Sequence, residues 1–301
     1  MVRSPFGRPR PAALGARLAT VLAVLAPLIA GCSLEDMPRF GWPRGVTPQA
    51  DRMLQLWSAS TIAALVVGVF VWGLIFWAVL RYRKRSGDDT LPEQVAYNLP
   101  IEVLYTVIPI LIISVLFYYT AVDQNYVNKE SAKPDVQVSV LAFKWNWQFG
   151  YVGLRDKNGQ FIQTVGSSTE VPILVLPVDK KVLFTQNSAD VVHAFYVPEF
   201  LFKRDVIPGR TNSFEVTVTR TGSFVGRCSE FCGTYHSMMN FEVRAVSLDD
   251  FNGFIAAKQD GMTTAQALEA IGQAPHATTT RPFGNDRGQR DADAPGSGQR
   301  Q

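Results

Sequence analysis

Residues 228–239 read CSEFCGTYHSMM, so two thiols, an imidazole and thioethers fall within a single short stretch. A second histidine, His193, lies upstream in the stretch DVVH, residues 190–193. Cysteine and methionine are soft ligands, and imidazole suits copper, zinc, iron or nickel. Two cysteines, two histidines and a methionine therefore favour copper. Zinc is the weaker interpretation, because methionine is a poor zinc ligand and the histidine spacing fits no common zinc finger.

The spacing of the two cysteines adds a further constraint. A single-copper electron-transfer site needs one cysteine, two histidines and a weak axial methionine, whereas Cys232 follows Cys228 by only four residues. Two thiolates on one loop can each bridge two metal ions, with one histidine at each end. Such a pair would spread one electron over two metals, which suits a fast relay. The cysteines alone would also suit a disulfide, because thiols oxidise in an extracytoplasmic domain.

The start of the chain is typical of a bacterial targeting signal. The chain has 301 residues, 47% of them hydrophobic, a net charge of +3 and three cysteines, which suffices for membrane spans and one soluble domain. Residues 1–31 combine a basic segment with an apolar run over residues 18–30. They end at Cys32 in the stretch IAGC, which resembles a lipoprotein signal. We expect Cys32 to be lipidated; the alternative is an ordinary free cysteine.

Two uncharged apolar stretches, residues 53–80 and 103–122, predict a transmembrane hairpin over residues 53–122. Each stretch is long enough as a helix, at ~1.5 Å per residue, to cross a hydrocarbon core of ~30 Å. The connecting loop, residues 81–101, begins RYRKR, and basic loops remain in the cytoplasm. Residues 32–52 and everything after about residue 123 are therefore expected on the outer side of a bacterial plasma membrane.

Residues 123–272 are predicted to form an extracytoplasmic all-β domain. Short β-branched or aromatic runs alternate with turn residues, and no βαβ rhythm is present, which favours a sandwich or barrel. These runs cover residues 136–140, 171–176, 182–184, 214–218 and 241–246. His193 is expected to end one strand, and the 228–239 loop to join two later ones. Residues 248–271 are expected to be helical.

Two further expectations concern single segments. The stretch FKWNW, residues 143–147, would place both of its tryptophans on one face of a strand, because side chains alternate along a strand. Residues 273–301 are rich in glycine, arginine, aspartate, glutamine and proline without apolar periodicity, so we predict a disordered tail.

The CSEFCGTYHSMM loop with its upstream DVVH resembles the dinuclear copper-A centre of cytochrome c oxidase subunit II. The resemblance covers about residues 42–260, and actinobacterial aa3-type members are the most similar. It implies a two-helix hairpin followed by a cupredoxin-like Greek-key sandwich. The ligands that it implies are His193, Cys228, Cys232, His236, Met239 and the backbone carbonyl of Glu230.

The resemblance also assigns roles to four other groups. Trp145 corresponds to an exposed tryptophan where the donor's electron arrives, although a large aromatic residue would also suit a core. Glu102 corresponds to a glutamate at the start of a proton path into subunit I, although the helix dipole also favours a carboxylate there. The Glu230 side chain corresponds to a ligand of a magnesium ion shared with subunit I, with Asp205 nearby, although both would suit exposed acids.

The implied function is that of the electron-accepting subunit of a proton-pumping cytochrome c oxidase. Electrons would come from cytochrome c, or from a cytochrome c domain of a quinol-oxidising complex, and pass to heme in subunit I for reduction of oxygen to water. Other oxidase subunits and membrane lipid are the further expected partners, and nothing indicates nucleic acid. Residues 123–260 contain fifteen acidic and fourteen basic residues, which attracts a soluble basic cytochrome only weakly. We therefore expect a donor tethered in a supercomplex.

Four other classes of protein share some of these features. A copper-free quinol oxidase subunit II shares the hairpin and sandwich but lacks the ligands. Nitrous oxide reductase has a similar copper loop and a large additional catalytic domain. A membrane-anchored copper chaperone carries its Cys-x-x-x-Cys in a thioredoxin-like fold. The fourth class is a structural lipoprotein whose sandwich is closed by a disulfide.

Overall fold

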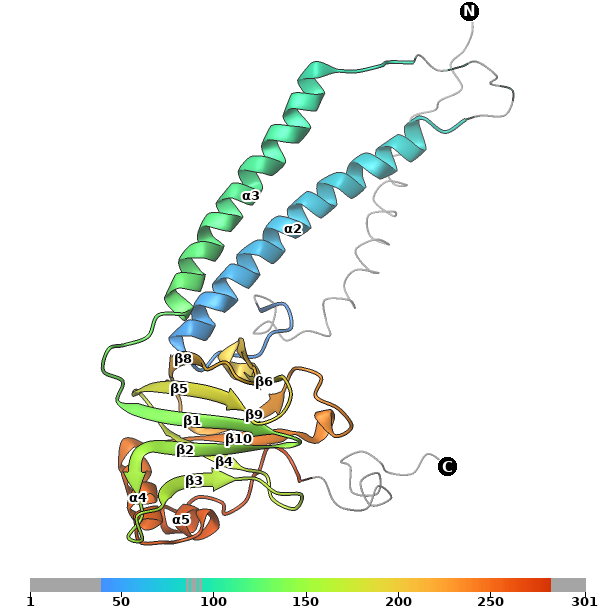
Figure 1. Cartoon of the computed structure of the whole chain (residues 1–301). Coiled ribbons are helices and arrows are strands. Elements are labelled where there is room, and N and C mark those ends of the chain that lie inside the picture. The colour runs from blue at the N-terminus through green and yellow to red at the C-terminus, as the bar shows by residue number, and fades with distance from the viewer. Residues whose placement is uncertain (1–38, 85–86, 88–90, 92–93, 283–301) are drawn as a thin grey trace, which may run out of the picture. The chain divides into compact units, whose positions relative to one another are not determined.

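The computed structural model describes residues 39–282 except for 85–86, 88–90 and 92–93, and shows two long helices followed by β-sheets and two short helices (Figure 1). The predicted signal peptide and Cys32 lie outside the described residues, as do residues 283–301 of the predicted tail.

The two long helices are α2 (Pro48–Arg81) and α3 (Leu99–Val127), and they run alongside each other in Figure 1. Thr47 and Asn98 cap their first turns, and each helix has a proline in its first two positions, where a missing N–H costs nothing. Within the described part of the chain these two helices are long and apolar enough to cross a membrane. The structure thus confirms the predicted hairpin.

The extracytoplasmic domain is a sandwich of two five-stranded sheets, with strand orders β3-β2-β1-β5-β8 and β4-β10-β9-β6-β7. The β1–β5 and β4–β10 pairs are parallel, and the other pairs are antiparallel. The strands are β1 (Val136–Phe143), β2 (Asn146–Arg155), β3 (Phe161–Val165), β4 (Ile173–Pro177), β5 (Lys181–Ser188), β6 (His193–Val197), β7 (Phe202–Val206), β8 (Asn212–Thr217), β9 (Gly222–Cys228) and β10 (Asn240–Val246). The predicted runs overlap β1, β4, β5, β8 and β10, and the sandwich prediction is confirmed.

Aromatic side chains fill the space between the two sheets. Trp147 and Phe149 of one sheet contact Phe195 and Phe241 of the other, with ring centroids 5.2–6.4 Å apart. All four side chains are buried. A side chain at position 226 would not fit here, because a Cβ added to Gly226 would lie 2.1 Å from the Phe241 ring. This packing holds the end of the sandwich from which the 228–239 loop extends.

Tyr151 links the two sheets by hydrogen bonds. Its buried hydroxyl donates to the Val175 carbonyl at 2.9 Å and accepts from the Val175 N–H at 3.1 Å. Tyr151 belongs to β2, whereas Val175 lies on β4, the edge strand of the other sheet. The side chain therefore satisfies backbone groups that no neighbouring strand can reach.

The segment that precedes α2 is built into the sandwich. The side chain of Val46 is 1% exposed and belongs to the core. Its N–H donates to the carbonyl of Glu199 at 3.0 Å, and its carbonyl accepts from the N–H of Thr219 at 2.9 Å. The first membrane helix therefore starts from a point fixed to the β-domain.

The structure differs from two of the strand expectations. His193 is the first residue of β6, not the last residue of a strand. Trp145 lies in the turn between β1 and β2 rather than on a strand, so the two tryptophans do not share a strand face. Trp147 is fully buried, whereas Trp145 is partly exposed. The chain turns between them, which interrupts the alternation on which the expectation depended.

The C-terminal part of the domain begins as expected and then departs from the sequence interpretation. Helices α4 (Leu248–Gln259) and α5 (Thr264–Ala270) confirm the predicted helical region. Residues 274–279, which fall within the predicted disordered tail, form a strap across β10. The buried side chains of Glu242 and Arg244 hold this strap through hydrogen bonds. The low apolar content of residues 274–279 suggested disorder, but polar contacts keep this strap ordered.

Candidate metal centre

The 228–239 loop connects β9 to β10, as the sequence predicted, and folds back on itself. The Cys228 N–H donates to the Met239 carbonyl at 2.9 Å, which closes the loop at its base. The same carbonyl accepts from the indole N–H of Trp147 at 3.2 Å. The Ser229 N–H donates to the Ala194 carbonyl at 3.1 Å, which connects the loop to β6. Three strands and a core tryptophan thus fix the positions of the loop's two ends.

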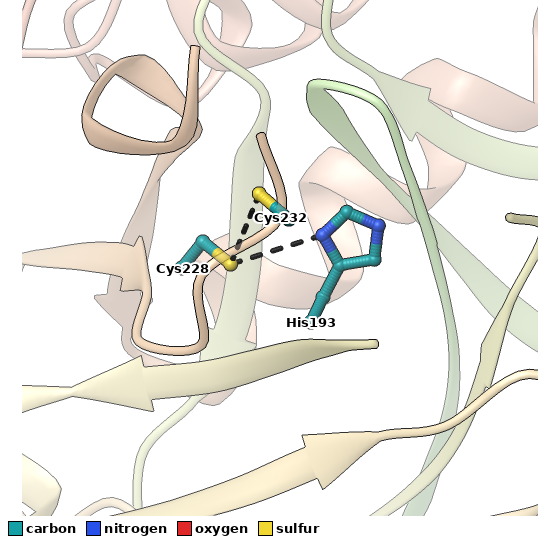
Figure 2. A group of neighbouring side chains, drawn as sticks. All are labelled: His193, Cys228 and Cys232. Atoms are coloured by element: carbon teal, nitrogen blue, oxygen red, sulfur yellow. Dashed lines mark hydrogen bonds between the residues drawn. The ribbon is translucent and has the colours of Figure 1, made fainter. Parts of the chain in front are cut away.

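The loop brings the two cysteine sulfurs together with the upstream histidine. The Sγ atoms of Cys228 and Cys232 lie 3.8 Å apart, and Nδ1 of His193 lies 3.8 Å from Cys228 Sγ. In Figure 2 dashed lines join the Cys228 sulfur to both the Cys232 sulfur and the His193 ring. The donor atoms of the three residues all lie within 4.8 Å of one another. An S–S bond is about 2.05 Å long, so the two cysteines do not form a disulfide.

Three more donor atoms surround the second sulfur and the crest of the loop. Nδ1 of His236 and Sδ of Met239 lie 3.5 Å and 3.9 Å from Cys232 Sγ. The carbonyl oxygen of Glu230 lies 3.2 Å from Cys228 Sγ. All six donor groups that the sequence resemblance implied are therefore neighbours. His193 lies beside the Cys228 sulfur and His236 beside the Cys232 sulfur, so each thiol has its own imidazole neighbour.

This donor set fits the copper pair that the resemblance implied. Soft sulfur donors with imidazole favour copper over harder cations. The side chains of His193 and Met239 are fully buried, and those of Cys228 and Cys232 are only 6% and 5% exposed. His193, Cys228, Cys232, His236, Met239 and the Glu230 carbonyl would hold the metal.

An aspartate outside the loop orients His193. Oδ1 of Asp190 lies 2.8 Å from Nε2 of His193, so the other ring nitrogen, Nδ1, points to Cys228. The Asp190 carboxylate also accepts from the backbone N–H groups of Lys144 and Val191. A partner of this kind fixes the tautomer and the ring orientation of a metal-binding histidine.

The two thiols differ in acidity. Burial raises the pKa of Cys228, but hydrogen bonds with His193 and with the loop backbone outweigh it, and the pKa falls to about 7. Burial, and then the charge of Cys228, raise the pKa of Cys232 to about 12. Burial lowers the pKa of His193, yet hydrogen bonds to Cys228 and Asp190 raise it overall. A metal that binds both sulfurs as thiolates would therefore release protons.

Trp145 lies directly against the loop. Its indole N–H donates to the carbonyl of Cys232 at 3.0 Å. Gly233, whose φ is +113°, lies beneath the ring, and a Cβ at that position would approach the indole to 3.3 Å. Sequence reasoning chose Trp145 by resemblance, and the structure gives it a direct contact with a cysteine of the site.

The other predicted site residues lie outside the sulfur cluster. The carboxylates of Glu230 and Asp205 are partly exposed, and each lies 3.7 Å from the Lys203 ammonium between them. Glu102 lies in the first turn of α3, where its carboxylate accepts from the Asn98 N–H at 2.9 Å. Cys32 lies outside the described residues.

Sequence reasoning did not identify two residues at the site. Asp190 belongs to the DVVH stretch, and an acid three residues before a candidate ligand histidine is a local signal for such a partner. Tyr235 belongs to the loop, and its ring packs edge-on against Trp145 with centroids 5.0 Å apart. No local pattern predicts that contact, because Trp145 is distant in the sequence.

A two-helix membrane anchor joined to a β-sandwich, with two cysteines and a histidine grouped at the strand ends, defines a membrane-anchored protein with a candidate metal site.

Comparison with known proteins identifies the family. The family model of the cytochrome c oxidase subunit II periplasmic domain matches residues 137–246, and that of the subunit II transmembrane domain matches residues 37–120. A probable cytochrome c oxidase subunit 2 of Nocardia farcinica is 46% identical over 93% of this chain and 90% of its own length. The chain belongs to the cytochrome c oxidase subunit II family.

A second relative agrees with this assignment. Cytochrome c oxidase subunit 2 of Mycobacterium tuberculosis is 43% identical over 90% of this chain and 89% of its own length. Among solved structures, the chain is similar to the periplasmic domain of subunit II of cytochrome oxidase of Bradyrhizobium japonicum, which is 28% identical over 44% of this chain and all of its own, with a TM-score of 0.39.

Family membership makes the chain a subunit II of the cytochrome c oxidase type, anchored in the membrane with its C-terminal domain on the extracytoplasmic side. The copper chaperone alternative is wrong, because the cysteines lie in a β-sandwich and not in a thioredoxin-like fold. The disulfide-closed lipoprotein is also wrong, because both cysteines of the domain are free thiols.

Proposed function

We propose that this chain is the electron-accepting subunit of its oxidase, with a copper pair held in the 228–239 loop. The observation that carries the proposal is the convergence of six donor groups, two sulfurs 3.8 Å apart among them. Copper held by these donors would supply the uptake and release of one electron at a time. The function proposed is to accept electrons from cytochrome c and pass them to heme in subunit I.

The protein holds the metal-donor atoms in fixed positions. An electron-transfer site works fast when its ligands move little between the two redox states, and ligands held on rigid elements move least. His193 begins a strand and is oriented by Asp190, and Cys228 ends a strand. The burial of the sulfurs also keeps water from the donors, which limits solvent rearrangement.

Trp145 is the proposed point of arrival of the donor's electron. Its partly exposed ring is within reach of a docked protein, and its N–H is bonded to the Cys232 carbonyl. That bond connects the molecular surface to a sulfur of the site through a short covalent path. Substitution of Trp145 by phenylalanine removes the bond and should slow the oxidation of reduced cytochrome c without changing the copper content.

Glu230 and Asp205 are proposed to face subunit I and to contribute to a magnesium site there. Magnesium binds few protein carboxylates and keeps several waters, so one glutamate from this chain is sufficient. Lys203, which lies between the two acids, would have to release Glu230 when the ion binds. The substitution E230Q should lower the magnesium content of the assembled oxidase and leave the copper content unchanged, because only the Glu230 carbonyl faces Cys228.

Glu102 is proposed to lie at the start of a proton path at the cytoplasmic end of α3. Its carboxylate also accepts a hydrogen bond from the Asn98 N–H, so a test must separate the role in a proton path from the role as a helix cap. The substitution E102Q keeps an acceptor oxygen for that bond and removes the titrating group. Slower proton uptake by E102Q in proteoliposomes would support the path, and normal uptake would leave only the helix-capping role.

The donor is proposed to be a cytochrome c domain tethered in a supercomplex, because residues 123–260 contain fifteen acidic and fourteen basic residues. So small a net charge gives little long-range attraction. Tethering raises the effective concentration of a donor without such attraction. Fast turnover of the isolated oxidase with soluble cytochrome c, falling steeply with salt, would contradict this proposal.

The central experiment measures the metal content and the electron paramagnetic resonance spectrum of the purified oxidase. We expect two coppers in this subunit that share one unpaired electron. The variants C228S and C232S should each abolish that signal. One copper per subunit, or a localised spin on a single copper, would refute the relay.

A further inference from the structure

The ring of Tyr235 packs against Trp145 beside the sulfur site. The two ring centroids lie 5.0 Å apart at an interplanar angle of 82°, an edge-to-face arrangement. Aromatic pairs prefer this geometry, because the positive edge of one ring faces the negative face of the other. Both residues are partly exposed. The pair therefore lies at the surface of the domain, next to the loop.

We propose that Tyr235 is a positioning residue that holds the indole of Trp145 against the carbonyl of Cys232. The inference rests on the proposed role of Trp145 as the point where electrons arrive.

Three contacts of the indole come from the 228–239 loop. The Cys232 carbonyl accepts the indole N–H at 3.0 Å. Gly233 leaves room for the ring, since a Cβ there would lie 3.3 Å from the indole Cζ2. The Tyr235 ring packs against the indole. Trp145 also packs against the hydrophobic core, but the Tyr235 ring is the aromatic partner that holds the indole on its loop side.

The backbone around Tyr235 makes its position rigid. The Tyr235 carbonyl accepts from the Met238 N–H at 2.9 Å, and the Gly233 carbonyl accepts from the His236 N–H at 3.1 Å. These bonds form the short η3 helix (His236–Met238), which follows Tyr235 directly. Because Tyr235 adjoins the ligand His236, its ring ties the indole to the same backbone that carries the metal donors.

Loss of the Tyr235 ring is predicted to lower the fraction of time that the Trp145 indole N–H is bonded to the Cys232 carbonyl. An edge-to-face pair of this kind shifts such an equilibrium by about two- to tenfold. Loss of the Tyr235 ring should therefore lower the rate at which the bound donor delivers its electron by about two- to tenfold. The substitution removes no donor atom, so copper content and the copper spectrum should not change.

The first test needs no metal. The full chain, purified in detergent without copper, is labelled with 5-fluorotryptophan, and its six tryptophans give six fluorine resonances. The resonance that disappears in W145F belongs to Trp145. We expect Y235L to shift this resonance towards its solvent-exposed value, and Y235F, which keeps the ring, to restore it. F161L, which removes an exposed aromatic residue of β3, should leave it unchanged.

The second test measures oxidation of reduced cytochrome c by the assembled oxidase. Y235L should lower kcat about two- to tenfold with little change in KM, and Y235F should restore it. If W145F is slow but Y235L matches wild type in rate and fluorine resonance, the positioning role is refuted while the role of Trp145 stands. If W145F itself is as fast as wild type, the proposed role of Trp145 fails. If copper is lost from Y235L, the fluorine resonance of the metal-free chain decides.

Discussion

The contacts of the C-terminal strap with β10 should make a short C-terminal segment essential for the stability of the domain. Arg244 donates to the carbonyls of Ala274 and His276. The backbone and hydroxyl groups of Thr278 and Thr279 donate four hydrogen bonds to the Glu242 carboxylate. A stop codon after residue 273 removes the strap, whereas one after residue 282 keeps it.

Removal of these contacts should lower the free energy of unfolding of the domain. Six hydrogen bonds to charged groups contribute roughly 9–18 kcal/mol at about 1.5–3 kcal/mol each. Ordering residues 274–279 costs roughly 6–12 kcal/mol at about 1–2 kcal/mol per residue. The mid-range values, about 13.5 and about 9 kcal/mol, differ by about 4.5 kcal/mol, so the stop after residue 273 should lower the free energy of unfolding by roughly this amount.

A substitution within the buried pair provides a second perturbation. R244M in the full chain leaves the fully buried carboxylate of Glu242 without its cation, which costs about 3–5 kcal/mol. In the chain that stops after residue 273, water reaches Glu242, and the same substitution should cost less than about 1 kcal/mol. The two changes should therefore be strongly non-additive.

Urea unfolding of the chain in detergent micelles measures these effects. The fluorescence of Trp147, which is buried between the sheets, reports on unfolding of the sandwich. The chain that stops after residue 282 is the matched control and should unfold like the full chain. If the stop after residue 273 changes the midpoint no more than this control, or if R244M costs the same in both backgrounds, the reasoning is refuted.

Three further predictions concern single side chains. The substitution D190N should weaken copper binding by the metal-free chain about 10–100-fold, because it replaces the charged carboxylate that orients His193 with a neutral amide; competition with a chelator measures this. Y151F should lower the free energy of unfolding by about 1–3 kcal/mol, because it leaves the Val175 N–H and carbonyl unpaired. G226A should cost about 1–3 kcal/mol or more, because its methyl group would overlap the aromatic core; urea unfolding measures both.

Each of these predictions has an outcome that would contradict it. D249N neutralises an exposed acid far along the chain; it is the control for D190N and should leave copper affinity unchanged. Equal affinities for D190N and wild type would mean that His193 needs no charged orienting partner. An unfolding midpoint of Y151F equal to that of wild type would show that water replaces the hydroxyl at Val175. A fully stable G226A would mean that Phe241 can move aside.

Features that depend on short segments could be predicted from the sequence. Four of the implied copper ligands, together with the Glu230 carbonyl, lie within twelve consecutive residues, so the loop defines its own chemistry. The membrane hairpin is equally local, because an uncharged apolar stretch must leave water wherever the rest of the chain folds. The β-sandwich followed from short alternating runs and their turns, since burial on one face imposes a period of two.

Contacts between distant segments required the tertiary structure. Trp145 and Cys232 are separated by 87 positions, and Glu242 and Thr278 by 36, so no local pattern connects them. The disorder prediction for residues 273–282 depended on their polar composition, but a buried ion pair supplied the partners that composition does not reveal. Sequence alone determined which side chains are the candidate metal donors and which segments are apolar enough to enter the membrane, because those properties belong to each segment. The tertiary structure decided which groups orient those side chains, because an orienting contact exists only when two distant strands are brought together.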